Sequence, residues 1–350
     1  MRFDCIISLM TEPIDIEKKS KRKAWLTPVE QVAHLKSKGV RFDLISEADS
    51  VRYLTENSNY FRLRSYRTGF AKVDEGKRAG EYARLDFKML VDLSIIDMLL
   101  RYEMLPMTLD VEHFAKVTLL GKIEASGEDG YAVVEDFLES YDWTGDDGKV
   151  HNATKDEISR GKSSPYAKCL IAKYPDFDYP AWAFMEVITF GTFAYFYKFC
   201  AERFGDQDMT DDFYLLQSVK GLRNACAHNN CIINDMTAGK PRHRARYAVM
   251  EALGGVDGVG AGQRRSKMSN ERFQQIVTTL YMHERLASSG IHEHKCAELA
   301  EFVERMNCHL DYYAGNYQVI SGFDFLTKVI GAWFPVEAAE KGLETPTKHE

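Results

Sequence analysis

Hydrophobic residues recur along most of this chain at the spacing of an α-helix. Between residues 84 and 101 an apolar side chain returns every three or four positions, and a second helix is expected to begin near Thr108. The same spacing predicts helices over residues 271–287, 295–313 and 319–333. Segments that alternate strictly between apolar and polar residues over the length of a strand are scarce. The pattern therefore predicts an all-α fold.

Helix-start signals are clearest near the beginning of the chain. Thr27 can cap a helix whose first residue is Pro28, and Glu30 can complete a capping box with Thr27. This helix is expected to end before Gly39, because glycine commonly follows the last residue of a helix. Residues 46–49 offer a second start, and the helix that follows is expected to end near residue 57.

The middle of the chain contains two further apolar segments. Aromatic and aliphatic residues follow Pro180 as far as Phe193, which predicts one long buried helix. Another helix is expected over residues 211–228. Residues 254–269 are rich in glycine and then basic, so we expect a flexible linker or a mobile loop there.

These elements divide the chain into three expected regions. Residues 1–23 form a basic N-terminal segment, residues 24–240 form a helical domain, and residues 241–350 form a C-terminal helical region. The run EKKSKRK at residues 17–23 is either a solvated segment, which we favour, or an arm that grips phosphates. A second basic run, KPRHRAR, lies at residues 240–246.

Composition narrows the class of protein. The chain has 350 residues, of which 45% are hydrophobic, and this is enough apolar material for a sizeable core. A net charge of -7 argues against nonspecific coating of nucleic acid, but a local basic cleft can still bind RNA. Seven scattered cysteines without a CxxC pair fit reduced thiols. Since no apolar run is long enough to span a bilayer, we expect a cytoplasmic protein that does not associate with membranes.

A block of aromatic and arginine residues, NYFRLRSYRTGF, occupies residues 59–70. Such mixtures can stack on bases and bind phosphates. In the other interpretation, which we slightly favour, the aromatic rings belong to the core and the arginines make internal salt bridges. The candidates for contact with RNA are Arg62, Arg64, Tyr66 and Arg67.

Residues 211–228 carry the polar pattern with the clearest chemistry. On a helical wheel the apolar residues of the core stripe are Leu215, Val219, Leu222 and Cys226. Asn224 and His228 are four positions apart, so they share a face, and that face lies nearly opposite the stripe. Arg223 lies between the two, and its long side chain can swing toward the polar face. The helix is therefore expected to be buried on one side and to present these three polar residues on the other.

Arginine, asparagine and histidine together suit RNA cleavage by internal transfer. Histidine moves protons near neutral pH, and arginine holds phosphate oxygens with two hydrogen bonds. Asparagine can orient the imidazole or bind the ribose, and the reaction needs no metal. Because one histidine cannot easily serve both ends of the reaction, a homodimer that pairs two copies of the motif is attractive. The plainer interpretation is that these are ordinary residues of an exposed helix face.

The sequence also resembles a known family. LRNACAH, at residues 222–228, matches the R-[NDH]-x(3)-H signature of HEPN ribonucleases. The surrounding blocks resemble the Abi-like (AbiD/AbiF) group of abortive-infection proteins, in an order and spacing similar to theirs. These blocks are AWLT at residues 24–27, NYFRL at 59–63, PAW at 180–182 with Glu186, and TFG at 189–191. The resemblance covers roughly residues 24–235.

The resemblance implies a HEPN-type helical bundle with additional C-terminal helices. It implies a metal-independent ribonuclease of antiphage defence, toxin-like and restrained by a partner, which for some relatives is a noncoding RNA. Arg223 and His228 would be catalytic, Asn224 would support them, and Glu186 would line the same pair of helices. The family usually continues after the histidine with a basic or aromatic run. This chain has NNCIIN at residues 229–234 instead, which leaves the substrate contacts after the motif open.

Two further features have alternative interpretations. Glu186 lies inside an apolar helix, where a carboxylate either faces a polar cleft, which we favour, or pairs with a cation such as Arg223. A group of potential metal ligands comprises His283, His292, His294 and Cys296. Their spacing is not one of the strong zinc patterns, so neither a metal nor any other cofactor is expected.

The sequence therefore favours an endoribonuclease but leaves two rivals. A HEPN domain can also bind RNA or a protein partner as a scaffold without cutting. A purely structural helical protein would have no affinity for RNA. Substitution of His228 separates the first two classes, because a nuclease would lose cleavage and keep binding.

Overall fold

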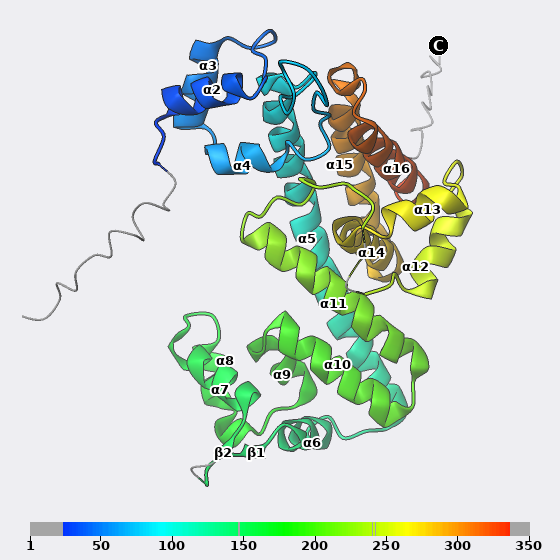
Figure 1. Ribbon diagram of the computed structural model, residues 1–350. Coiled ribbons are helices and arrows are strands. Elements are labelled where there is room, and N and C mark those ends of the chain that lie inside the picture. Colours follow the sequence, from blue (N-terminus) through cyan, green and yellow to red (C-terminus); the bar gives the residue numbers. More distant parts are fainter. Residues whose placement is uncertain (1–23, 146–147, 240, 242, 337–350) are drawn as a thin grey trace, which may run out of the picture. The chain divides into compact units, whose positions relative to one another are not determined.

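The computed structural model describes residues 24–145, 148–239, 241 and 243–336 (Figure 1). These residues contain fifteen α-helices and one pair of two-residue strands, which confirms the expected all-α fold. The basic run at residues 17–23 lies outside the described residues, and the run at 240–246 is described only in part. Within the described ranges, no helix combines the length and hydrophobicity that a bilayer crossing requires.

The chain forms two compact units. Among the described residues, the first comprises residues 24–61 and Lys72–Lys88, and the second comprises Arg62–Ala71 and the described residues from Met89 onward. The boundary expected between residues 240 and 241 stays a prediction.

The first unit contains α2 (Pro28–Ser37) and α3 (Glu47–Glu56), which pack against each other. The expected capping box at the start of α2 is confirmed. The Thr27 amide donates to the Glu30 carboxylate at 2.7 Å, and the Glu30 amide donates to Thr27 Oγ1 at 3.4 Å. The buried carboxylate of Asp86 accepts the Asp43 amide at 2.8 Å and so holds the turn between α2 and α3.

The second unit is built around α5 (Phe87–Ser126), whose first two residues belong to the first unit. We expected two helices here, but α5 runs without a break for 40 residues and contains Pro106. A proline removes one helical hydrogen bond and crowds the preceding turn, so burial has to compensate for it. Met104 and Met107, on either side of it, are fully buried, and Thr108 Oγ1 donates to the Leu105 carbonyl at 2.6 Å.

The single long helix expected after Pro180 is wrong, because the segment forms two helices. These are α9 (Ala181–Val187) and α10 (Phe190–Phe204), and Ile188 between them is extended. Thr189 caps α10, and its amide donates to the Glu157 carboxylate at 2.5 Å. This contact with a carboxylate far away in the sequence holds the break between the two helices.

Four long helices complete this unit. They are α11 (Gln207–Ala227), α14 (Glu271–Leu286), α15 (Ser289–Asn307) and α16 (Tyr317–Trp333). Helix α11 packs against α10 on one side and against α14 on another (Figure 1). The predicted helices at 271–287 and 319–333 are confirmed, whereas α15 begins six residues before its predicted start and ends before residue 313.

The flexible linker expected at residues 254–269 is also wrong. The segment contains α13 (Ala261–Lys267) and packs through buried apolar residues, among them Val256, Val259 and Met268. Lys267 is itself buried, and its Nζ donates to Ser321 Oγ at 2.7 Å. Burial lowers the pKa of Lys267 to about 8. The segment is therefore ordered by the apolar residues between its glycines, because these residues are buried in the core.

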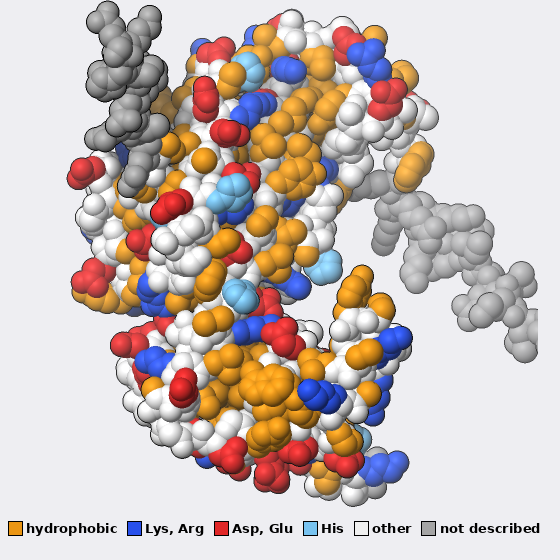
Figure 2. All heavy atoms as spheres, turned by 180° about the vertical axis from the view of Figure 1, so that it is seen from behind, with side chains coloured by type: hydrophobic (Ala, Val, Ile, Leu, Met, Phe, Trp, Pro, Cys, Tyr) orange, Lys and Arg blue, Asp and Glu red, His pale blue; other side chains and the backbone are white. Residues whose placement is uncertain are grey.

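Shorter elements complete the described chain. The short helices are α4 (Tyr60–Ser65), α6 (Ala132–Ser140), α7 (Ala153–Arg160), α8 (Lys168–Lys173) and α12 (Tyr247–Ala252). The strands β1 (Trp143–Thr144) and β2 (Val150–His151) are antiparallel, with the Trp143 and His151 rings stacked 4.6 Å apart. On the face that Figure 2 shows, acidic and basic side chains are interspersed over the surface.

Candidate active site

The end of α11 carries the RNxxxH motif as the helical wheel predicted. The core stripe is buried at Leu215, Val219, Leu222 and Cys226. Asn224 and His228 are exposed, and Arg223 is half-buried. His228 is the residue that ends the helix, and its amide donates to the Asn224 carbonyl at 2.9 Å. The predicted division into a buried face and a polar face is therefore confirmed.

Arg223 lies directly beside Asn224. Its Nη1 donates to Asn224 Oδ1 at 3.2 Å, which orients the guanidinium along the polar face of the helix. Its Nε is buried and has no hydrogen-bond partner among the described residues. Because a guanidinium carries five N–H donors, Arg223 has donors beyond this hydrogen bond for an acceptor such as a phosphate.

The chain turns sharply just after His228. Asn229 adopts a left-handed conformation with φ of 56°, as asparagine commonly does at the residue after a helix, and the Asn230 amide donates to the Ala225 carbonyl at 2.8 Å. Arg62 Nη1 donates to the Asn229 carbonyl at 2.8 Å, and Arg101 Nη1 donates to the Asn230 carbonyl at 3.3 Å. Two arginines from other helices thus hold the backbone that follows the motif.

Asp97 lies at the centre of this arrangement and is fully buried. Its Oδ1 accepts the backbone amides of Ile232 and Ile233 at 2.7 and 2.9 Å. Its Oδ2 accepts a hydrogen bond from Arg62 at 3.3 Å and another from Arg101. Burial, together with the neighbouring Arg62 guanidinium, lowers the pKa of Arg101.

We call Asp97, Arg62 and Arg101 the anchor network. A buried charge is costly unless opposite charges and hydrogen bonds satisfy it, and here both carboxylate oxygens of Asp97 are satisfied. The network ties α4 and α5 to the segment directly after His228. It therefore fixes where α11 ends and how the polar face of its last turn is supported.

The four residues proposed to contact RNA differ in their exposure to solvent. Arg62 belongs to the anchor network, with a side chain only 17% exposed. Tyr66 is 2% exposed and lies beside Cys231; burial and that thiol raise the pKa of its hydroxyl. A ring so deeply buried cannot stack on a base in this conformation. Arg64 is exposed, and Arg67 is half-buried with its Nε donating to the Arg64 carbonyl at 3.4 Å.

Glu186 lies on the exposed side of α9, with its side chain 63% exposed. Its ion pair is with Lys116 of α5 at 3.9 Å, and not with Arg223. Lys116 also pairs with Glu112 at 3.4 Å. Exposure removes the cost of burial that the sequence suggested for this carboxylate, and no described contact joins it to Asn224 or His228.

The potential metal ligands around residues 283–296 form a different kind of cluster. His283 is fully buried, and its Nε2 lies 3.2 Å from Asp110 Oδ2. Burial lowers the pKa of His283, while the hydrogen bond with Asp110 opposes that shift. The His292 ring stacks on Phe334 at 4.7 Å. Among the described residues, no three histidine, cysteine or acidic side chains are arranged to hold one metal ion.

Sequence reasoning missed Asp97 and Arg101 as parts of the site. Both lie in the apolar stretch that becomes α5, four positions apart, which is one helical turn. A pair of opposite charges on a stripe of buried residues is the signal that could have identified them. Their partners at residues 229–233 lie more than 120 positions away and could not be inferred from local pattern.

The chain was compared with known proteins in three ways. Residues 53–234 match the family described as Abi-like protein. No curated protein and no solved structure matches the chain. The match includes the motif at the end of α11, the anchor network and the loop that the network holds. Because it spans more than half of the sequence, the chain belongs to the Abi-like protein family.

Proposed function

We propose that this protein is a metal-independent endoribonuclease of the HEPN type that acts in antiphage abortive infection. One observation carries the proposal. Arg223, Asn224 and His228 share the accessible end of α11, while the anchor network holds the backbone behind them. Membership of a family named for abortive infection supports the biological context.

The proposed reaction is an internal transfer at phosphorus. The ribose 2′-oxygen loses its proton and forms a bond to phosphorus, while the bond from phosphorus to the 5′-oxygen breaks and that oxygen gains a proton. The products are a 2′,3′-cyclic phosphate and a 5′-hydroxyl. His228 exchanges the protons as the general acid or base, since imidazole titrates near neutral pH.

Arg223 binds the phosphate oxygens in this scheme and stabilises the charge that builds on them. Asn224 keeps the guanidinium in place through the 3.2 Å hydrogen bond to its Oδ1. Glu186 and Arg64, both exposed, are proposed to contact the RNA strand rather than to exchange protons. Arg62 and Tyr66 are proposed to support the site without contacting RNA, by holding the loop at residues 229–233.

A homodimer follows from the chemistry of proton transfer. One imidazole removes a proton and another donates one, and the chain carries a single RNxxxH motif. Two copies related by a twofold axis would place two His228 side chains at one phosphate. A partner, either a regulatory noncoding RNA or a protein, would restrain the activity by covering the same face of α11.

The test is cleavage of a mixed RNA pool in excess chelator. We expect wild-type protein to cut, and His228→Ala and Arg223→Ala to lose cleavage by about 10²- to 10⁴-fold. His228→Ala should still bind RNA. The matched control is His294→Ala, which removes another exposed histidine, from α15. RNA binding without cleavage by the wild-type protein would favour the non-catalytic scaffold.

A further inference from the structure

The polar face of α11 that ends in Asn224 and His228 continues toward the start of the helix. Tyr214, Gln217 and Gly221 precede these two residues at alternating spacings of three and four, which keep all five positions on one face. Tyr214 is 45% exposed, and Gln217 and Gly221 are half-buried. At a rise of about 1.5 Å per residue, the face extends about 21 Å from Tyr214 to His228, which is long enough for several nucleotides.

Helix α14 borders this face on one side. Arg285 of α14 pairs with Asp212 at 2.6 Å, and the Gln275 amide nitrogen lies 2.9 Å from the position that a β-carbon at Gly221 would occupy. The two helices therefore run in opposite directions, and the Gln275 side chain lies over Gly221. Arg272, one turn before Gln275 on α14, consequently lies toward the end of α11 that carries the motif.

Hydrogen-bond donors along this face lack partners within the protein. Gln217 Nε2 is buried and has no partner in the described chain. The Gln275 amide and the Arg272 guanidinium are half-buried, and neither makes a hydrogen bond or an ion pair with a described side chain. A buried donor without an acceptor is costly, so an acceptor-rich ligand on this face would be favourable. Bases and phosphates supply such acceptors.

An aromatic and basic platform forms the far end of the face. The Arg246 guanidinium stacks on the Tyr214 ring, with 3.7 Å between Cζ and the ring centroid. Arg246 Nη2 also lies 3.7 Å from Asp211, and its Nε is buried and unpaired in the described chain. Arg244 is exposed, and both arginines belong to the basic run at residues 240–246. Exposed rings beside arginines suit the stacking of bases and the binding of phosphates.

The charge of this surface favours a single strand of RNA as its ligand. Arg246 and Arg272 border the face although the whole chain carries a net charge of -7, so the positive charge is local. A duplex keeps its bases paired and stacked, whereas the bases of a single strand can reach an aromatic ring. We call the following residues the α11 strip: Tyr214, Gln217, Gly221, Arg246, Arg272 and Gln275.

We propose that the α11 strip binds the single-stranded RNA that continues from the cleaved phosphate. A base stacks on Tyr214, Arg246 and Arg272 bind phosphates, and the amides of Gln217 and Gln275 bind base edges. The proposal rests on the proposed ribonuclease function, because the motif at the end of the strip makes the cut. Its specific consequence is a preference for RNA long enough to reach Tyr214.

The first measurement is fluorescence anisotropy of the full-length protein with a labelled oligonucleotide whose 2′-hydroxyls are methylated, so that it cannot be cut. Tyr214→Ala with Arg272→Gln should bind at least about tenfold more weakly than wild type, equivalent to about 1.4 kcal/mol. Tyr214→Phe with Arg272→Lys keeps the ring and the charge and should bind within about threefold of wild type. The matched control is Tyr317→Ala with Arg265→Gln, which removes an exposed tyrosine from α16 and an exposed arginine from α13.

The second measurement is the dependence of cleavage on RNA length. A dinucleotide at the motif cannot reach Tyr214, so the ratio of kcat/KM for a long RNA to kcat/KM for a dinucleotide should fall about tenfold in Tyr214→Ala with Arg272→Gln. Gly221→Leu changes no charge and replaces a poor helix former with a good one. Its side chain would lie across the strip beneath Gln275, so it should lower the same ratio.

The outcomes separate this proposal from the ribonuclease function. Absence of binding by the wild-type protein, or equal weakening in the strip variant and in the control, would overturn the proposal. So would cleavage by wild type with an unchanged length preference in Gly221→Leu and in the Tyr214→Ala double variant, which would leave the ribonuclease function standing. Binding that depends on the strip, without cleavage by wild type, would support the strip and contradict the ribonuclease function. Circular dichroism checks that each variant is folded.

Discussion

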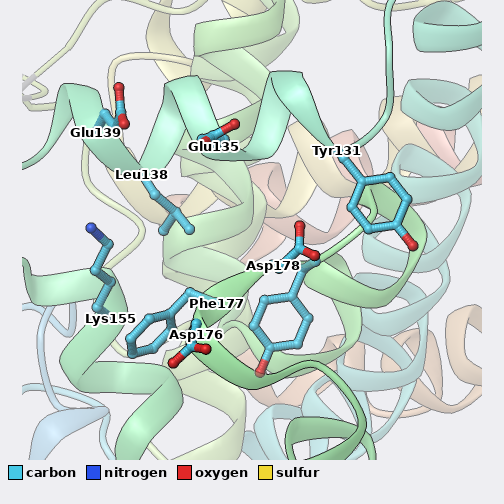
Figure 3. Close-up of a pocket in the computed structure, with 9 residues that line it drawn as sticks. Tyr131, Glu135, Leu138, Glu139, Lys155, Asp176, Phe177 and Asp178 are labelled. Carbon is cyan, nitrogen blue, oxygen red and sulfur yellow. The ribbon is translucent and has the colours of Figure 1, made fainter.

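Two groups of charged residues in the second unit differ in how their charges are satisfied. The carboxylate of Asp97 is fully buried, and four hydrogen bonds from two arginines and two amides satisfy it. The carboxylates that line a surface pocket beside α6 are exposed and form no ion pair with a described residue; they belong to Glu135, Glu139, Asp176 and Asp178 (Figure 3). The first group holds a backbone segment in place, and the second remains in contact with solvent.

The difference shows that burial decides whether a charged side chain needs partners within the protein. Burial makes an unpaired charge so costly that a buried carboxylate must be satisfied within the protein. An exposed carboxylate carries no such penalty, because water solvates its charge. The anchor network therefore supports the proposed active site without entering the chemistry, whereas Arg223 and His228 keep donors accessible.

The largest expected effect comes from Asp97→Ala. It leaves the buried Arg101, the half-buried Arg62 and two backbone amides without their shared acceptor, so we expect a loss of about 3–5 kcal/mol in the free energy of unfolding. Urea-induced unfolding measures it. Asp324→Ala, which breaks the exposed pair with Lys328, should cost less than about 1 kcal/mol. Equal losses would contradict the distinction between buried and exposed charges.

Lys267 provides a buried charge whose Nζ donates to Ser321 Oγ, and burial outweighs the opposing effect of the Asp324 carboxylate on its pKa. Its pKa is lowered to about 8 in the folded state, so the unfolded chain binds more protons between pH 8 and 10.5. Stability should consequently rise with pH over that window. Lys267→Met should be more stable than wild type at pH 7, by about 2 kcal/mol, and should lack this rise.

Thermal unfolding of the two proteins at several pH values tests this prediction. The difference between the proteins should shrink as the pH rises from 8 to 10.5. Parallel curves across that window would show that Lys267 keeps an ordinary pKa in the folded protein.

Arg62→Lys separates support of the loop from contact with RNA. Lysine cannot reach both Asp97 and the Asn229 carbonyl as the guanidinium does, so stability should fall by about 1 kcal/mol. Cleavage should fall with it while RNA affinity is retained, as filter binding and single-turnover rates would show. Arg265→Lys, which changes an exposed arginine on α13, is the control. Weaker RNA binding by Arg62→Lys alone would instead make Arg62 an RNA contact.

The smallest effect is expected for Glu135→Gln with Glu139→Gln. Removing two like charges one turn apart on α6 should leave stability unchanged or raise it by less than about 0.5 kcal/mol. A calorimetric melting curve is the measurement. A clear loss of stability would mean that these carboxylates are structural, like Asp97.

Features that depend on neighbours in the sequence could be predicted. The capping box of Thr27 and Glu30 and the buried and polar faces of α11 are both present as expected. Each depends on residues within a few helical turns. The same local logic found the RNxxxH motif, because its three side chains share one end of a helix.

Features that depend on distant contacts could not be predicted. Two helices were predicted where α5 lies, but burial of the turns around Pro106 keeps α5 intact. Thr189 breaks the helix after Pro180 because Glu157, 32 positions earlier, accepts its amide. Asp97 looked like an ordinary polar residue until the chain brought Ile232 and Ile233 to its side chain.

The most direct test of the central claim is the chemical nature of the RNA ends that the protein produces in excess chelator. The account predicts fragments that end in a 2′,3′-cyclic phosphate and begin with a 5′-hydroxyl, formed by the wild-type protein and lost in His228→Ala. Cleavage that persists in His228→Ala, or fragments with a 5′-phosphate, would contradict the proposed role of the motif at the end of α11.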